Sequence, residues 1–90
     1  MNRVFLSLGS NKGDSFKNIN DCIKLISKIN NILIINKSKI YTTKPMYNYN
    51  QKYFLNMVIE INTILGPEIL LYKLQNIEFR LGRRKNKLRN

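Results

Sequence analysis

The side chains of this chain suit the binding of anions better than imidazole-based acid–base chemistry. The chain has 16 Lys and Arg residues against 5 Asp and Glu residues, and it has no histidine. Imidazole catalysis and imidazole metal ligands are therefore excluded. Cys22 is the single cysteine, which excludes an internal disulfide and a thiolate cluster and predicts a small packing residue. A net charge of +11 favours the arrival of polyphosphate ligands.

Basic residues are densest near the C-terminal end, where six lie between Arg80 and Asn90. Taken alone, such a run is more often a solvated tail than a binding site. Nucleic acid is another candidate partner for so basic a chain. However, Lys, Asn and Ile supply 38 of the 90 residues, as an A/T-rich coding sequence would produce. A dedicated nucleic-acid surface is therefore the less favoured interpretation.

The first half of the chain predicts a strand, a loop and a helix. Residues Arg3–Leu8 are rich in β-formers and end at Gly9, so we expect a buried strand followed by a loop over Gly9–Asp14. Asp14 or Ser15 can cap the helix that follows, and Asn30-Asn31 should end it. The predicted apolar stripe of this helix consists of Phe16, Ile19, Ile23, Ile26 and Ile29.

The second half predicts two strands and a helix. Ile32–Tyr41 is dense in β-branched residues, Thr42–Lys52 has the composition of a loop, and Tyr53–Thr63 alternates as a half-buried strand. Gly66-Pro67 should open the last helix and Gly82 should end it. Its predicted apolar stripe consists of Leu70, Leu74, Ile77 and Leu81.

The predicted order β-α-β-β-α defines an α+β fold of the ferredoxin-like class, in which two helices cover one face of an antiparallel sheet. The final strand of that unit is missing, which leaves the first strand as an exposed edge open to association. We expect one domain over residues 1–90, with 83–90 as a loose basic tail. No apolar stretch approaches a membrane span, so we expect a cytoplasmic protein without a membrane partner.

Three segments, in order, resemble the signatures of the 6-hydroxymethyl-7,8-dihydropterin pyrophosphokinases. They are GSNKGD, IYTTKPMYNYNQKYFLN and GPEILLYKLQNIEFRLGRRKNKLR. The spacing of Thr-x-Pro, Phe-Leu-Asn and Ile-Glu-x-x-Leu-Gly-Arg is the specific part, and the similarity covers essentially the whole chain. The resemblance implies a transferase of folate biosynthesis that moves pyrophosphate from ATP to the pterin and releases AMP.

The resemblance also implies roles for individual residues. The pterin-binding positions are Thr43, Pro45, Met46, Phe54 and Asn56, and the ATP-binding positions are Gln75, Glu78, Lys85 and Arg89. Arg83 matches a catalytic cation that offsets charge on the transferred group. The stretches 43–56 and 75–89 should then form neighbouring walls, one for a flat heterocycle and one for a triphosphate.

Departures from the family pattern limit these expectations. Lys85 stands where an arginine is usual, which keeps the charge but loses bidentate phosphate contact. The Asp-x-Asp segment that holds Mg²⁺ in the family would follow Asn90, so this chain contains no metal ligands of that kind. We therefore expect the 90 residues alone to be inactive, with Mg²⁺ required by a full-length enzyme. Two alternatives stay open: a basic ferredoxin-like RNA-binding module, and a decaying remnant of the enzyme without function.

Overall fold

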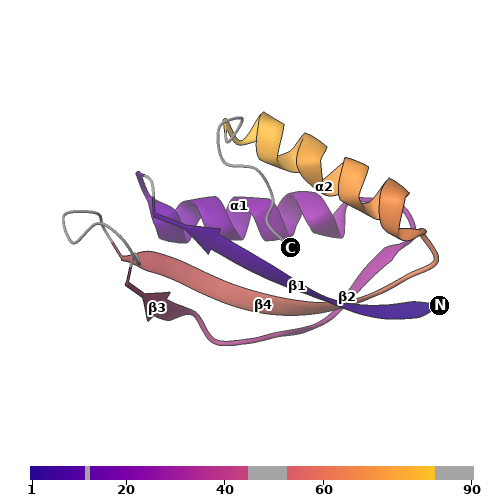
Figure 1. The fold of residues 1–90 in the computed structure, drawn as a ribbon, viewed down its shortest axis with the longest axis horizontal. Coiled ribbons are helices and arrows are strands. Elements are labelled where there is room, and N and C mark those ends of the chain that lie inside the picture. The colour runs from indigo at the N-terminus through magenta and orange to yellow at the C-terminus, as the bar shows by residue number, and fades with distance from the viewer. Residues whose placement is uncertain (12, 45–52, 83–90) are drawn as a thin grey trace.

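The computed structural model describes residues 1–11, 13–44 and 53–82, and these form one sheet layer and one helix layer (Figure 1). The elements are β1 (Asn2–Ser10), α1 (Ser15–Ser27), β2 (Ile32–Lys37), β3 (Tyr41–Thr43), β4 (Phe54–Thr63) and α2 (Pro67–Arg80). Both helices lie on the same side of the sheet. The predicted ferredoxin-like α+β class is thereby confirmed.

Strand β4 is the centre of the sheet, because every other strand pairs with it in antiparallel orientation. β1 pairs along one side, from Asn2↔Thr63 to Ser10↔Leu55. β2 and β3 follow one another along the other side of β4. Within the described residues, β1 has no second neighbour and therefore forms an edge of the sheet.

The predicted single strand Ile32–Tyr41 is wrong in one respect, because the structure divides it into β2 and β3. The register shifts between Ile34 and Asn36, and regular pairing stops after Lys37. Ser38 then bridges to β4: its N–H donates to the Val58 carbonyl at 2.8 Å, and the Val58 N–H donates to Ser38 Oγ at 2.9 Å. Pairing resumes at Tyr41, so Thr42 and Thr43 belong to a strand and not to the predicted loop.

Strand β1 is longer than predicted and includes Gly9 and Ser10. Its partner β4 has ten residues, and pairing continues over Gly9↔Asn56 and Ser10↔Leu55 before the chain leaves the sheet. Ser10 is buried, and its Oγ accepts a hydrogen bond from Asn18 Nδ2 of α1 at 3.3 Å. The sharp turn comes later, at Gly13, whose φ of +53° suits glycine.

Helix α1 begins as the sequence predicts, and of its predicted stripe Ile19 and Ile26 are buried while Ile23 and Ile29 are partly buried. Asp14 caps it, since Asp14 Oδ1 accepts from the Lys17 N–H at 3.0 Å. Ile19, Cys22 and Ile26 are buried against the sheet, so Cys22 is a packing residue as expected. The prediction is wrong for Phe16, whose side chain is 58% exposed in the first turn of the helix.

Helix α2 begins at Pro67 and packs on α1. Leu70 and Ile77 are buried, while Leu74 and Leu81 pack against the core in part. Gly82 adopts a φ of +79° directly after the helix, which confirms the predicted stop. No helix of the described part is long and apolar enough to cross a membrane.

The core lies between the helices and one face of β4. Met57, Ile59, Ile61 and Thr63 alternate as buried residues along that strand, as the sequence pattern predicts. The side chains between them point to the opposite face, which no described helix covers (Figure 1). The candidate site is at one end of this uncovered face.

Candidate functional site at the end of the sheet

Asn56 is the polar residue around which the candidate site is built. It lies near the start of β4, where β1 pairs on one side and β3 on the other. Its Nδ2 donates to Thr43 Oγ1 at 2.9 Å, and it also lies 3.4 Å from the Phe54 carbonyl oxygen and 3.5 Å from the Tyr41 carbonyl oxygen. The amide nitrogen is therefore held towards β3.

The register determines which face of the sheet carries Asn56. Leu55 is opposite Ser10, whose hydroxyl contacts α1, so Leu55 and Ser10 face the helices. Asn56 and its partner Gly9 consequently face the other way. Asn56 is half-buried without being packed against the helices, which leaves its amide accessible to a ligand at this end of the sheet.

Three of the five predicted pterin-binding residues can be placed, and the structure brings them together. Thr43 is directly opposite Phe54, and Asn56 is two residues further along the same strand. Phe54 and Asn56 therefore share the uncovered face, where Phe54 is half-buried. The other two, Pro45 and Met46, lie outside the described residues.

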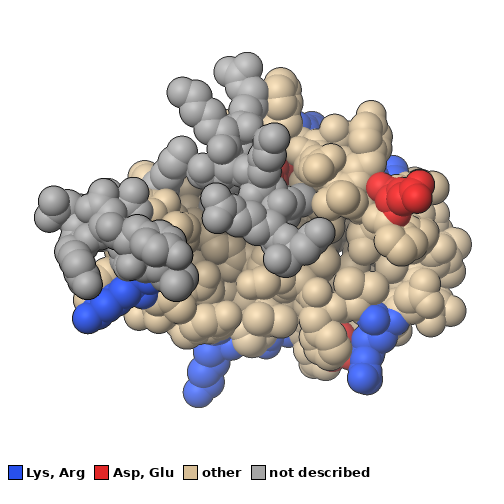
Figure 2. All heavy atoms as spheres, in the orientation of Figure 1, with Lys and Arg blue, Asp and Glu red and all other residues tan. Residues whose placement is uncertain are grey.

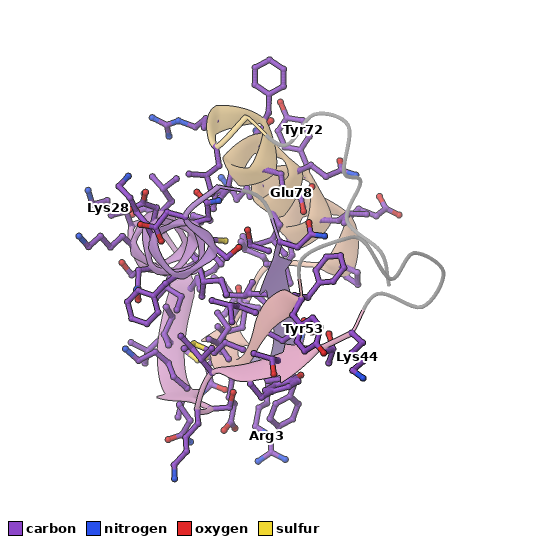
Figure 3. All side chains as sticks on the ribbon, turned by 90° about the vertical axis from the view of Figure 1, so that its left-hand side faces the viewer. Arg3, Lys28, Lys44, Tyr53, Tyr72 and Glu78 are labelled. Carbon is purple, nitrogen blue, oxygen red and sulfur yellow. The ribbon has the colours of Figure 1, made fainter. Side chains whose placement is uncertain are left out.

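Two of the predicted nucleotide-binding residues can be placed, and both belong to α2. Gln75 is exposed and Glu78 is half-buried. Figure 3, which looks onto the end of the molecule where β3 and β4 pair, shows Glu78 in the helix layer above and Tyr53 at the sheet below. Because Phe54 and Asn56 face away from the helix layer, the described residues do not bring the two predicted walls together on one face. The predicted catalytic Arg83, and Lys85 and Arg89, lie outside the described residues.

Sequence reasoning missed several residues that shape this end of the sheet. Tyr41 supplies a carbonyl to the Asn56 amide, and Gly9 is the neighbour of Asn56 on β1. Lys44 Nζ lies 6.0 Å from the centroid of the Tyr53 ring, at the cation–π limit. Only the strand register identifies Gly9 and Tyr41 as neighbours of Asn56, since they are 47 and 15 positions away in the chain.

The acidic residues do not fit a magnesium site. Asp14 and Asp21 lie on or beside α1, and Glu68 and Glu78 lie on α2. Glu60, on β4, is bound by Arg3 Nε at 3.4 Å and by Asn36 Nδ2 at 3.0 Å. The described residues contain no cluster of three His, Cys, Asp or Glu that could hold a metal ion.

Charged side chains project from both layers of the molecule. Figure 2 shows Lys and Arg side chains along the sheet side, further basic atoms at the helix side, and acidic atoms beside the start of α2. On α1, a hydrogen bond from Lys17 Nζ to Asp21 Oδ2 at 3.0 Å, together with the charge of that carboxylate, raises the pKa of Lys17. That exposed pair lies on the surface of α1.

The elements define a ferredoxin-like α+β domain, and Thr43, Phe54 and Asn56 lie together at one end of its sheet. The family model of 7,8-dihydro-6-hydroxymethylpterin-pyrophosphokinase (HPPK) matches residues 5–90. The chain therefore belongs to the HPPK family, as its resemblance to these enzymes predicted.

Individual relatives agree with this assignment. The chain is 41% identical over 86 residues to the folic acid synthesis protein fol1 of Schizosaccharomyces pombe, covering 96% of this chain and 12% of that protein. It is 38% identical to the 2-amino-4-hydroxy-6-hydroxymethyldihydropteridine pyrophosphokinase of Bacillus subtilis, covering 91% and 49%, and 40% identical to that of Aquifex aeolicus, covering 93% and 51%. The chain spans about half the length of these bacterial relatives.

Proposed function

We propose that this chain is the N-terminal part of a pterin diphosphokinase of folate biosynthesis and supplies the pterin-recognition wall of its active site. The observation that supports this best is the hydrogen bond from Asn56 to Thr43, which holds an amide beside Phe54 on the uncovered sheet face. An aromatic ring suits the flat face of a pterin, and a held amide suits its polar edge.

The proposed reaction joins the hydroxymethyl oxygen of the dihydropterin to the β-phosphorus of ATP. The bond from that phosphorus to the oxygen bridging the α-phosphate breaks, AMP leaves with the oxygen, and the hydroxyl proton is released. We assign charge stabilisation of the transferred group to Arg83, and triphosphate binding to Lys85 and Arg89. Gln75 and Glu78 share one face of α2, where we place the nucleotide.

Magnesium enters the proposal only as a requirement of the whole enzyme. When bound, it would supply positive charge that neutralises the phosphates of ATP. The carboxylates of this chain are dispersed over both helices and the sheet, so none of the steps above is assigned to a metal held by them. We therefore propose ligand binding for the chain by itself and catalysis for a protein that also provides the metal ligands.

Isothermal titration with a dihydropterin analogue tests this function. We expect the chain to bind the analogue. Asn56→Ala should weaken binding about tenfold, because it removes a polar contact with the ligand that contributes roughly 1.4 kcal/mol to the binding free energy. Asn62→Ala is the matched control, because Asn62 is another half-buried amide on the same face of β4 but near its other end. Equal loss in both variants, or no binding at millimolar analogue, would refute the pterin site.

A second candidate function, RNA binding, is favoured by one specific feature of the uncovered face. Phe5 is 60% exposed there, and the guanidinium carbon of Arg3 lies 5.6 Å from the centroid of its ring. Figure 3 shows Arg3 projecting from the sheet on the side away from the helices. This face therefore combines an exposed aromatic ring with a neighbouring guanidinium, which also contacts Glu60 at 3.4 Å.

Fluorescence anisotropy with a labelled single-stranded RNA separates this candidate from non-specific attraction. If Phe5 stacks on a base, Phe5→Ala should weaken binding by roughly fivefold or more at 150 mM salt, since stacking contributes about 1–3 kcal/mol per base. Phe16→Ala is the control, because Phe16 is equally exposed but lies on α1. RNA binding that disappears as the salt concentration rises, and that neither substitution changes, would reflect only net charge.

A further inference from the structure

Gly9 is a glycine that its own backbone does not require. It lies inside β1 and pairs with Asn56 in regular register. Among the described glycines, positive φ angles occur at Gly13 and Gly82, so Gly9 has an ordinary extended conformation that any residue could adopt. Glycine weakens a strand because it packs no side chain and loses more entropy on folding. Its presence therefore needs a cause outside its own dihedral angles.

The neighbouring amide provides that cause. A Cβ atom placed on Gly9 would lie 3.0 Å from Asn56 Oδ1, which is closer than side chains normally approach, and 3.7 Å from the Leu55 carbonyl oxygen. The distance to the Leu55 carbonyl oxygen is an ordinary van der Waals contact. The Asn56 side chain is therefore the group that would have to move. The amide thus occupies the space that a side chain on β1 would fill.

The two ends of the Asn56 amide are held by different strands. The nitrogen points towards β3, where Thr43 Oγ1 accepts at 2.9 Å, and the oxygen lies over Gly9 of β1. A larger residue at position 9 would push the oxygen away from β1 and strain the bond to Thr43. We infer that Gly9 is a positioning residue for pterin recognition: it allows the Asn56 amide to lie across the sheet with its oxygen presented above β1.

This inference rests on the proposed pterin site for its ligand, but its geometric part can be measured without ligand. In ¹⁵N-labelled protein, Gly9→Ala should shift the side-chain NH₂ signals of Asn56 while leaving those of Asn62 in place. Gly66→Ala is the matched control, since a Cβ there meets nothing within 4 Å and the φ of Gly66 is −68°. Unchanged Asn56 side-chain signals in Gly9→Ala would overturn the inference whether or not the chain binds a pterin.

A double-mutant cycle then tests the link to binding. Gly9→Ala should weaken binding of the dihydropterin analogue about tenfold or more, because a small displacement of a group that contacts the ligand has a large effect on affinity. It should leave the affinity for ATP unchanged. In an Asn56→Ala background the same substitution should have no further effect, because the clashing oxygen is gone. Loss of affinity that persists in that background would assign Gly9 to backbone structure and contradict positioning.

The cycle also covers the case in which Gly9→Ala does not fold. If the clash with Asn56 is the cause, the double variant Gly9→Ala/Asn56→Ala regains a cooperative urea transition by circular dichroism. If the double variant stays unfolded while Asn56→Ala alone folds, Gly9 is needed for the strand itself and the inference fails.

Discussion

Asn56 Nδ2 donates to Thr43 Oγ1 at 2.9 Å, and this bond joins two residues that are separated by 13 positions of chain. It links β3 to β4 through side chains at the point where the segment between the two strands begins and ends. The Tyr41 and Phe54 carbonyl oxygens, which can only accept, direct the nitrogen end of the amide towards β3, and the Thr43 hydroxyl provides its shortest hydrogen bond. The polar group on the proposed pterin wall is therefore held in part by a threonine that also lies in that wall.

Replacing Thr43 by valine should expose this dependence. Valine has nearly the same shape but no acceptor, so Asn56 loses its shortest hydrogen bond. We expect the free energy of unfolding to fall by about 0.5–1.5 kcal/mol, and binding of the pterin analogue to weaken. Thr43→Ser keeps the hydroxyl and should restore binding. Urea titration and calorimetry measure the two effects, and a Thr43→Ser variant as impaired as Thr43→Val would contradict the role of the hydroxyl.

Ile61 should be among the most sensitive core positions. It is fully buried on β4, where its register partners Val4 and Ile34 lie on either side. Ile61→Ala should cost about 2–5 kcal/mol through lost burial and a residual cavity. The free energy of unfolding of a domain of this size is only about 5–13 kcal/mol, so the urea concentration at the unfolding midpoint should fall steeply. Ile35→Ala, at a 42% exposed position beside the irregularity in β2, should change it little.

Periodicity predicted the elements of this fold because each depends on residues near one another in the chain. The alternation of Met57, Ile59 and Ile61 and the helical spacing of Ile19 and Ile26 are local patterns that burial then confirmed. The break between β2 and β3 was not predictable in this way. It depends on Ser38 bonding to Val58, a partner 20 residues away whose position requires the register.

The site was predictable in composition and not in geometry. The family resemblance indicated Thr43, Phe54 and Asn56, but neither their hydrogen bonding nor their common face follows from the motif. The sequence predicts that a strand ends at Gly9, whereas the structure pairs Gly9 with Asn56 inside the sheet. A close approach between two strands is visible only once their register is known.

The cap of α1 should contribute measurably to stability. Asp14 Oδ1 accepts from the Lys17 N–H at 3.0 Å and so satisfies an amide at the start of the helix. Asp14→Ala should lower the free energy of unfolding by about 0.5–2 kcal/mol in urea titration. Asp14→Asn keeps an oxygen acceptor and should lower the free energy of unfolding much less. If both variants lose the same amount, charge and not capping is the cause.

The free edge of β1 should make the chain self-associate. Within the described residues β1 pairs only with β4, so its other side presents unpaired backbone groups beside Val4 and Leu6. We expect light scattering after size-exclusion chromatography to show a mass that rises with concentration. Ser7→Lys adds charge to this edge strand and should reduce association, whereas Asn30→Lys adds the same charge after α1 and should not. A monomer at all concentrations, or equal effects of the two substitutions, would show that the β1 edge does not mediate contact.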